Sequence, residues 1–181
     1  MTIDSRAAQR GVVSIGHASE RAQPCVLIIW HSRTGASAAC ARAAAAGAGT
    51  AALLVSATDA VPEMLLAADG YIFCCPENLG SMSGLMKEMF DRCYYPVLGR
   101  IEARPYATLI AAGSDGAGAQ RQIDRIATGW RLRRVAEPLI VNFAAQTPAA
   151  IAAPKQVPDT VVQQCRELGA ALAEGLAAGI F

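Results

Sequence analysis

The sequence predicts an α/β fold, a doubly wound parallel sheet of five strands with helices on both faces. Short, continuous apolar runs recur along the chain, as is typical of parallel strands that are buried on both faces. Each run is followed by a segment with helical periodicity or high helix propensity. Strands that alternate with helices in this way form parallel sheets, because each helix carries the chain back across the sheet.

The first strand, Cys25–Trp30, contains only apolar residues. The alanine-rich segment Ala38–Ala46 has high helix propensity and predicts the helix that follows, which Gly47 and Gly49 end. Ala51–Val55 is predicted as the second strand because it is a short, mainly apolar run.

The middle of the chain predicts a short helix, a strand and an amphipathic helix. Val61–Ala68 is the short helix, and Tyr71–Cys75 is an apolar strand that Pro76 closes. The helix Ser83–Tyr95 follows, with Ser83 as its N-cap and its apolar residues on one face. Its other face carries two i,i+4 pairs of opposite charge, Lys87 with Asp91 and Glu88 with Arg92.

The last third of the chain predicts two strands and two helices. Tyr106–Ala112 is the fourth strand, and Ala119–Trp130 is a helix with one apolar face. Val135–Phe143 is the fifth strand, in which Pro138 indicates an edge strand or a bulge. A proline-containing loop then leads to the final helix, Thr160–Ala178.

The composition indicates one domain and excludes several classes of partner. We expect residues 24–181 to form this domain and residues 1–23 to be a mobile N-terminal segment. Hydrophobic residues make up 53% of the chain, and 16 lysines and arginines nearly balance 15 acidic residues, which gives a net charge of +1. Such a balance provides no electrostatic basis for binding nucleic acid or an anionic membrane.

Hydropathy and cysteine usage indicate a cytoplasmic protein. The run Ala43–Val55 is too short to span a bilayer, and the first 23 residues lack the apolar block of a signal peptide. The six cysteines are scattered without a C-x-x-C pair, and the two histidines complete no zinc pattern. We therefore expect reduced thiols and no metal site.

Doubly wound sheets bind their ligands beyond the carboxyl ends of the strands, and three loops there have unusual compositions. The first consists of Ser32, Arg33, Thr34, Gly35, Ala36 and Ser37. Its hydroxyl groups precede a helix whose first N–H groups are unpaired donors, so this loop predicts a phosphate site. It matches neither a Walker A loop nor G-x-G-x-x-G, and an ordinary capped turn remains the alternative.

The second and third loops are rich in glycine, which lets a backbone approach a flat ligand closely. The second consists of Pro76, Glu77, Asn78, Leu79, Gly80, Ser81, Met82, Ser83 and Gly84. The third consists of Gly113, Ser114, Asp115, Gly116, Ala117 and Gly118. Each could be a flexible connection, but three such loops at one edge of a sheet predict a site for a phosphorylated planar ligand.

These motifs resemble the flavodoxin-like superfamily, and within it the NAD(P)H-dependent FMN reductases and the multimeric quinone reductases similar to tryptophan-repressor-binding protein. The first loop is similar to that family's phosphate pattern, Ser/Thr-x-Thr-Gly-x-Ser/Thr, and Pro76–Arg92 resembles the segment after its third strand. The resemblance implies strand order 2-1-3-4-5 and bound FMN. By the same likeness, Ser32–Ser37 would hold the phosphate, Pro76–Met82 would line the ribityl chain and flavin ring, and Gly113–Gly116 would meet the isoalloxazine from the other side.

The implied function is that of an oxidoreductase that uses NAD(P)H as co-substrate to reduce a quinone, a free flavin or another small acceptor. Leu79 and Met82 would leave a flavin face open, and the second and third loops contain no aromatic side chain. A flavodoxin-type electron carrier and a flavin-free interaction domain of the same fold remain alternatives.

No catalytic side chain is expected, because hydride transfer is the chemistry of the cofactors. We expect His31 to have an orienting or structural role. Asp115 either accepts a hydrogen bond from the flavin N3–H or forms a turn.

Association with further copies is also expected. The helix after the third strand carries five large apolar side chains, more than one sheet face covers: Met86, Met89, Phe90, Tyr94 and Tyr95. The family likeness implies a homodimer or homotetramer whose interface completes the flavin site. The alternative is that this helix is buried within its own chain.

Overall fold

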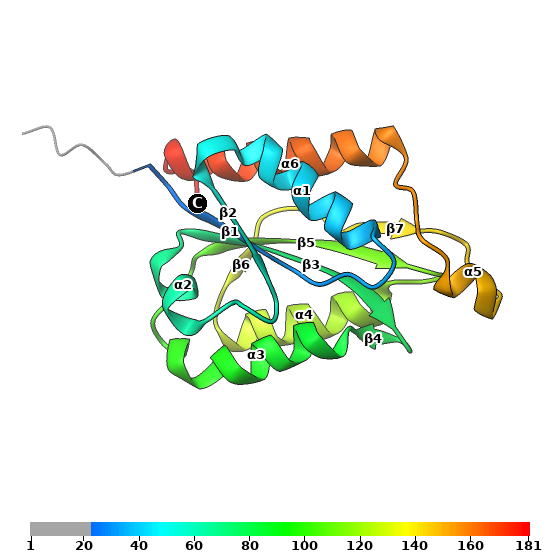
Figure 1. Cartoon of the computed structure of the whole chain (residues 1–181). Coiled ribbons are helices and arrows are strands. Elements are labelled where there is room, and N and C mark those ends of the chain that lie inside the picture. Colours follow the sequence, from blue (N-terminus) through cyan, green and yellow to red (C-terminus); the bar gives the residue numbers. More distant parts are fainter. Residues whose placement is uncertain (1–22) are drawn as a thin grey trace, which may run out of the picture.

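The computed structural model describes residues 23–181, so apart from Gln23 the segment expected to be mobile lies outside the described residues. Figure 1 shows a central sheet with helices on both faces, which confirms the predicted fold class. The strands are β1 Val26–Trp30, β2 Ala52–Ser56, β3 Gly70–Asn78, β4 Ser81–Met82, β5 Pro105–Ala112, β6 Arg133–Arg134 and β7 Leu139–Asn142.

The parallel strands are ordered β2-β1-β3-β5, and both β6 and β7 pair with β5 on its outer side. Because β6 and β7 occupy one strand position in succession, this is the expected order 2-1-3-4-5. Pro138 lies between the two pieces, and its missing N–H accounts for the break in the predicted strand Val135–Phe143. The strands β1, β3, β5 and β7 end at one edge, which we term the carboxyl edge.

Helices connect the strands across both faces. They are α1 Ala36–Ala48, α2 Pro62–Ala67, α3 Gly84–Val97, α4 Ala117–Gly129, α5 Pro148–Ala152 and α6 Asp159–Ala177, with a 3-10 turn η1 Gly49–Ala51. α1 and α6 lie side by side on one face, and α3 and α4 cover the other (Figure 1). Among residues 23–181, no helix combines the length and the apolar character needed to cross a bilayer.

The alternation of side chains along the central strands builds two core layers. Ile28 packs toward α1 and α6, whereas its neighbour Ile29 packs toward α3 and α4. The second layer contains an aromatic cluster in which the Phe90 ring centroid lies 4.9 Å from that of Phe73 and 5.3 Å from that of Trp130. These buried rings hold α3 and α4 against the sheet.

The helix α3 buries most of the apolar surface that suggested association. Met86, Met89 and Phe90 are at most 1% exposed, and the two predicted ion pairs lie on the outer side of the helix. Tyr95 is 80% exposed at the far end of the helix. The chain therefore covers most of this surface by itself.

Some local expectations were wrong. Gly47 does not end the first helix, because α1 continues to Ala48 and has Gly49 as its C-cap. Pro76 does not close the third strand, because β3 continues to Asn78 and forms a hairpin with β4. β1 has already ended beside Cys74, so the missing N–H of Pro76 interrupts no hydrogen bond on that side. The proline-containing loop before the last helix also contains α5, in which Thr147 accepts a hydrogen bond from the Ala150 N–H as N-cap.

The pair α1 and α6 packs with almost no space between the two backbones. A Cβ atom on Gly47 would lie 1.9 Å from the carbonyl oxygen of Arg166, and one on Gly169 would lie 2.0 Å from that of Ala44. Only glycine permits this approach. Because α1 begins at the first predicted loop, the contact fixes the position of that loop.

We predict that Gly169→Ala lowers the free energy of unfolding by about 1–3 kcal/mol, because its methyl group must displace the backbone of α1. The sign is informative, since alanine is otherwise the better residue in a helix. Gly84→Ala in α3 is the matched control, because a Cβ atom there meets nothing within 4 Å. Urea denaturation of both variants tests this, and equal stabilities would contradict it.

Candidate functional site

A cavity of about 350 Å³ opens at the carboxyl edge, where all three predicted loops meet. It is lined by Ser32, Arg33, Thr34, Ala36, Ser37, Pro76, Glu77, Asn78, Ala111, Ala112, Gly113, Phe143, Ala145, Ile151, Ala152 and Lys155. The first loop thus contributes all of its predicted residues except Gly35. The second contributes Pro76, Glu77 and Asn78, and the third contributes Gly113.

The first loop leaves the N-terminus of α1 without a cap. Gly35 adopts a left-handed conformation, φ 94°, and its N–H donates to the Ser32 hydroxyl at 3.1 Å. Within the described part of the chain, no acceptor pairs with the N–H groups of Ala36, Ser37 and Ala38. Three free donors at a helix N-terminus attract an anion, because the helix dipole places positive charge there.

The side chain of Ser37 strengthens this interpretation. Ser37 is 1% exposed and lines the cavity, and its hydroxyl is the one fully buried side-chain N or O atom of the described residues without a hydrogen-bond partner. A buried polar group without a partner is costly, so its position at the cavity indicates a ligand that completes it.

The N-terminus of α4 lies at the same edge but has an internal partner. Its N-cap, Gly116, is also left-handed, and its N–H donates to the Glu77 carboxylate at 2.7 Å. The N–H groups of Gly118 and Ala119 donate to the same carboxylate at 2.9 and 3.2 Å. Glu77 therefore caps α4, and of the two helix N-termini only that of α1 is open to a ligand.

The second loop is a hairpin rather than a flexible connection. Glu77 pairs with Met82, and Asn78 pairs with Ser81. Leu79 and Gly80 form the turn, both with positive φ, and the Leu79 side chain is fully exposed. The ladder uses some of the backbone N–H groups that we expected to face a ligand.

The glycines of the third loop permit internal contacts. A Cβ atom on Gly116 would lie 2.4 Å from Ile140, and one on Gly118 would lie 2.0 Å from the carbonyl oxygen of Gly80. Ser114 and Asp115 are exposed and do not line the cavity, although the Asn142 side chain donates to the Ser114 carbonyl oxygen. Close approach to a ligand is therefore available only at Gly113.

A second cavity, of about 530 Å³, adjoins the first and shares Arg33 and Asn78 with it. The hairpin contributes Leu79, Ser81 and Met82 to its wall. The other lining residues are His31, Gly84, Leu85, Lys87 and Gln122. Its wall therefore carries basic side chains and contains no carboxylate. Gly35, Gly80, Ser114, Asp115 and Gly116 line neither cavity.

His31 is held in a fixed orientation at this second cavity. Its Nδ1 atom lies 2.8 Å from the hydroxyl of Ser83, which is fully buried. Ser83 is the N-cap residue of α3, as predicted, but its hydroxyl serves this contact and makes no capping hydrogen bond. Partial burial, and then the charge of Arg33, lower the pKa of His31 from its ordinary value, which favours the neutral ring.

Sequence reasoning missed the residues that come from the end of the chain. They are Phe143, Ala145, Ile151, Ala152 and Lys155. The Lys155 N–H donates to the Thr34 carbonyl oxygen at 2.8 Å, which joins this segment to the first loop. Nothing in the local sequence distinguishes these residues from an ordinary loop.

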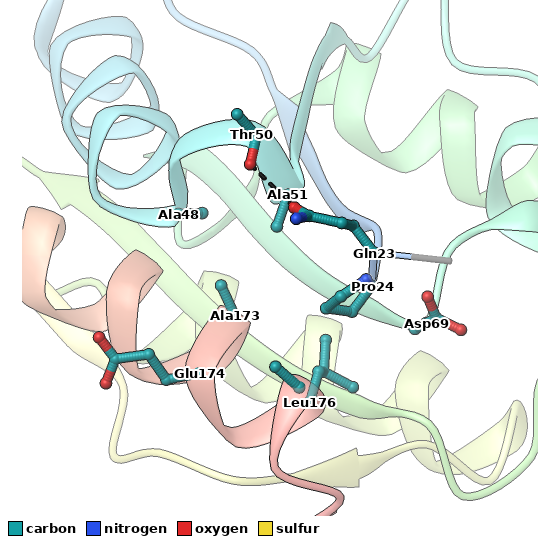
Figure 2. Close-up of a pocket in the computed structure, with 10 residues that line it drawn as sticks. Gln23, Pro24, Ala48, Thr50, Ala51, Asp69, Ala173, Glu174 and Leu176 are labelled. Carbon is teal, nitrogen blue, oxygen red and sulfur yellow. Dashed lines mark hydrogen bonds between the residues drawn. The ribbon is translucent and has the colours of Figure 1, made fainter. Parts of the chain in front are cut away.

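A larger cavity, of about 660 Å³, lies at the opposite end of the sheet (Figure 2). Its apolar wall is formed by Pro24, Ala48 at the end of α1, Ala51 in η1, and Ala173 and Leu176 from α6. It contains no free helix N-terminus and none of the predicted site residues, so size alone does not identify the functional site. Between residues 23 and 181, no His, Cys, Asp or Glu side chains form a cluster suited to a metal ion, and all six cysteines are free.

We predict that Glu77→Ala lowers the free energy of unfolding by about 1–3 kcal/mol, because three N–H groups of α4 lose their acceptor. Glu77→Gln, which keeps an acceptor oxygen, should cost less. Glu102→Ala is the control, because the exposed ion pair between Glu102 and Arg131 contributes little to the free energy of unfolding. Denaturant unfolding measures all three, and a Glu77→Ala variant as stable as the wild type would refute the capping role.

Comparison with known proteins agrees with this geometry. Residues 32–146 match the family model described as NADPH-dependent FMN reductase. No curated protein matches the chain. Among solved structures, the chain is similar to a flavodoxin from the domain Archaea, with a TM-score of 0.70 and 17% identity over 84% of this chain and 98% of that one.

Two further structures have the same fold. A flavodoxin, WrbA-like protein from Agrobacterium tumefaciens has a TM-score of 0.68 and 19% identity over 83% of this chain and 96% of that one. A flavone reductase has a TM-score of 0.66 and 18% identity, covering 83% of this chain and 62% of that one. The family match begins at the first predicted loop, contains all three predicted loops and extends past β7, and the neighbours confirm the flavodoxin-like fold. The chain therefore belongs to the NADPH-dependent FMN reductase family, and it is an FMN-binding oxidoreductase.

Proposed function

We propose that the chain binds FMN in the cavity at the carboxyl edge and catalyses NAD(P)H-dependent reduction of a quinone, a free flavin or another small acceptor. The observation that carries this proposal is the open N-terminus of α1 together with the unpartnered, buried hydroxyl of Ser37. Donors of this kind fit the 5′-phosphate of FMN, because a phosphate offers several charged acceptor oxygens at once.

In this proposal, the first loop holds the phosphate. The N–H groups of Ala36, Ser37 and Ala38 and the Ser37 hydroxyl donate to it, and the Thr34 hydroxyl and Arg33 stand at the rim. The loop is already positioned, since α1 is packed against α6 through Gly169. Binding therefore requires little reordering of the backbone.

The rest of FMN would extend along the carboxyl ends of β3 and β5. Pro76 and Asn78 at the end of β3 and Gly113 just after β5 line the cavity, and the family likeness implies that they contact the ribityl chain and the ring. Phe143 and Ile151 add apolar walls that suit a flat ring. Glu77 contributes by its backbone, because its carboxylate is engaged with α4.

The adjoining second cavity is the proposed site of the co-substrate and the acceptor. It meets the first cavity at Arg33 and Asn78, so a molecule bound in it could reach an edge of the flavin. Arg33 favours a negatively charged group such as the phosphates of NAD(P)H, whereas the charge of Lys87 is paired with Asp91. Bound FMN would supply the hydride chemistry, and the protein would supply position and electrostatics.

We further propose that the partner of this chain is a small-molecule electron acceptor, and that the chain binds neither nucleic acid nor a membrane. We also propose that the chain forms a homodimer or a homotetramer. Tyr95, Leu98 and Leu85 are the exposed apolar side chains of α3 and its C-cap that remain for contact with another copy, and Leu79 projects from the hairpin. This set is smaller than the sequence suggested.

The test is an absorbance spectrum of the protein mixed with FMN and then desalted, followed by anaerobic NADPH or NADH. We expect the flavin band at about 450 nm to be retained and to bleach with nicotinamide. Flavin that is retained but not bleached would favour an electron carrier. Loss of all flavin would refute FMN binding.

The matched variant in this test is Ser37→Ala with Thr34→Ala, which removes two hydroxyl groups of the first loop. We expect weaker retention of FMN, by about 1.5–3 kcal/mol for each charge-assisted hydrogen bond lost. Unchanged retention in this variant would mean that the loop is only a turn.

A further inference from the structure

We propose that Lys155 provides the charge that makes this site selective for a phosphorylated flavin over an unphosphorylated one. The inference rests on the proposed function and adds to it, because Lys155 lies about 120 residues beyond the phosphate loop in sequence and outside the family match. Three observations carry it: where its backbone lies, how its side chain is held, and which charges surround it.

The backbone of Lys155 lies directly against the first loop. Its N–H donates to the Thr34 carbonyl oxygen at 2.8 Å. On the other side, a Cβ atom built on Gly35 would lie 3.9 Å from the Lys155 carbonyl oxygen, which is ordinary contact. Residue 155 is therefore fixed next to the loop that would hold the phosphate.

The side chain is held at the cavity by uncharged acceptors. Its Nζ atom donates to the carbonyl oxygens of Ala150, Ile151 and Ala153, at 2.5, 3.2 and 2.6 Å, around the end of α5. These oxygens satisfy the ammonium group but carry no formal charge. Within residues 23–181, no carboxylate forms an ion pair with Lys155.

The surrounding charges leave this cation without compensation. Glu77 is the acidic residue in the cavity wall, and its carboxylate is turned to the N–H groups of α4. Lys87 is, by contrast, paired with Asp91 at 2.5 Å. Arg33 is exposed to solvent, which screens its charge, whereas Lys155 is partly buried.

An uncompensated cation in a partly buried wall attracts a phosphate dianion more strongly than it would in water. It has no comparable effect on the neutral flavin ring. The same residue also holds α5, whose Ile151 and Ala152 line the cavity. A charge effect and a packing effect can therefore be separated. Loss of packing weakens the binding of both flavins, whereas loss of charge weakens the binding of the phosphorylated flavin alone.

The experiment measures the affinities of FMN and riboflavin by quenching of flavin fluorescence, in the wild type, Lys155→Met and Lys155→Arg. We expect Lys155→Met to weaken the affinity for FMN by about tenfold or more and to leave the affinity for riboflavin unchanged. The same substitution should reduce the salt dependence of FMN binding. Lys155→Arg should restore most of the preference for FMN. Arg42→Met is the matched control, since it removes an exposed cation of α1 that does not line the cavity.

Equal weakening of both flavins in Lys155→Met would overturn the inference and leave Lys155 with a packing role alone. Unchanged FMN affinity, or the same loss of FMN in Arg42→Met, would also overturn it. A wild-type chain that binds neither flavin would instead refute the proposed function, so the two failures are distinguishable. Thermal unfolding of the flavin-free variants identifies any that do not fold. If Lys155→Met does not fold, the test is Lys155→Arg, which keeps the charge: loss of its preference for FMN over riboflavin would overturn the inference.

Discussion

The structure depends on an asymmetry between two helix N-termini at one edge of the sheet. Both α1 and α4 begin after a left-handed glycine and expose the donors that every helix leaves free. The Glu77 carboxylate satisfies α4 from within the chain, whereas α1 has no internal acceptor and also buries the unpartnered hydroxyl of Ser37. A fold that satisfies one of these ends and leaves the other open is arranged for an anion at the open one.

The remainder of the fold keeps that end in place. The buried strands β1 and β3 fix where α1 starts, and the contact between Gly169 and the α1 backbone fixes where it lies. Glu77 joins the end of β3 to α4, so the second and third loops are rigid with respect to each other. The site is preorganised, and the free energy that a flexible loop would lose on ordering is available for binding.

The sequence was sufficient to predict the fold and the location of the candidate site. Apolar runs such as Cys25–Trp30 predicted the strands, and the carboxyl ends of those strands predicted where the loops converge. It was not sufficient to predict the extension of β3 through Pro76, because that depends on where the neighbouring strand β1 ends. Nor could it assign Glu77 to α4, since 39 residues separate the carboxylate from the Gly116 N–H.

The position of Lys155 in the site could not be predicted from the sequence either. Its segment follows the sheet and contains α5, a helix of five residues without a strong periodic signal. Only the folded chain brings Lys155 to Thr34, through a backbone hydrogen bond that any residue except proline can make. Local patterns thus predict elements and edges, whereas contacts between distant segments complete the site.

Amide hydrogen exchange with and without FMN compares the two helix N-termini directly. If the FMN phosphate binds at the open N-terminus of α1, FMN slows exchange at Ser37 and Ala38, where the N–H groups are free. Exchange at Gly118 and Ala119 should change no more than in the rest of the domain, because Glu77 already accepts from both. Unchanged exchange at Ser37 and Ala38 with FMN bound, or protection centred on α4, would show that the phosphate does not bind at the N-terminus of α1.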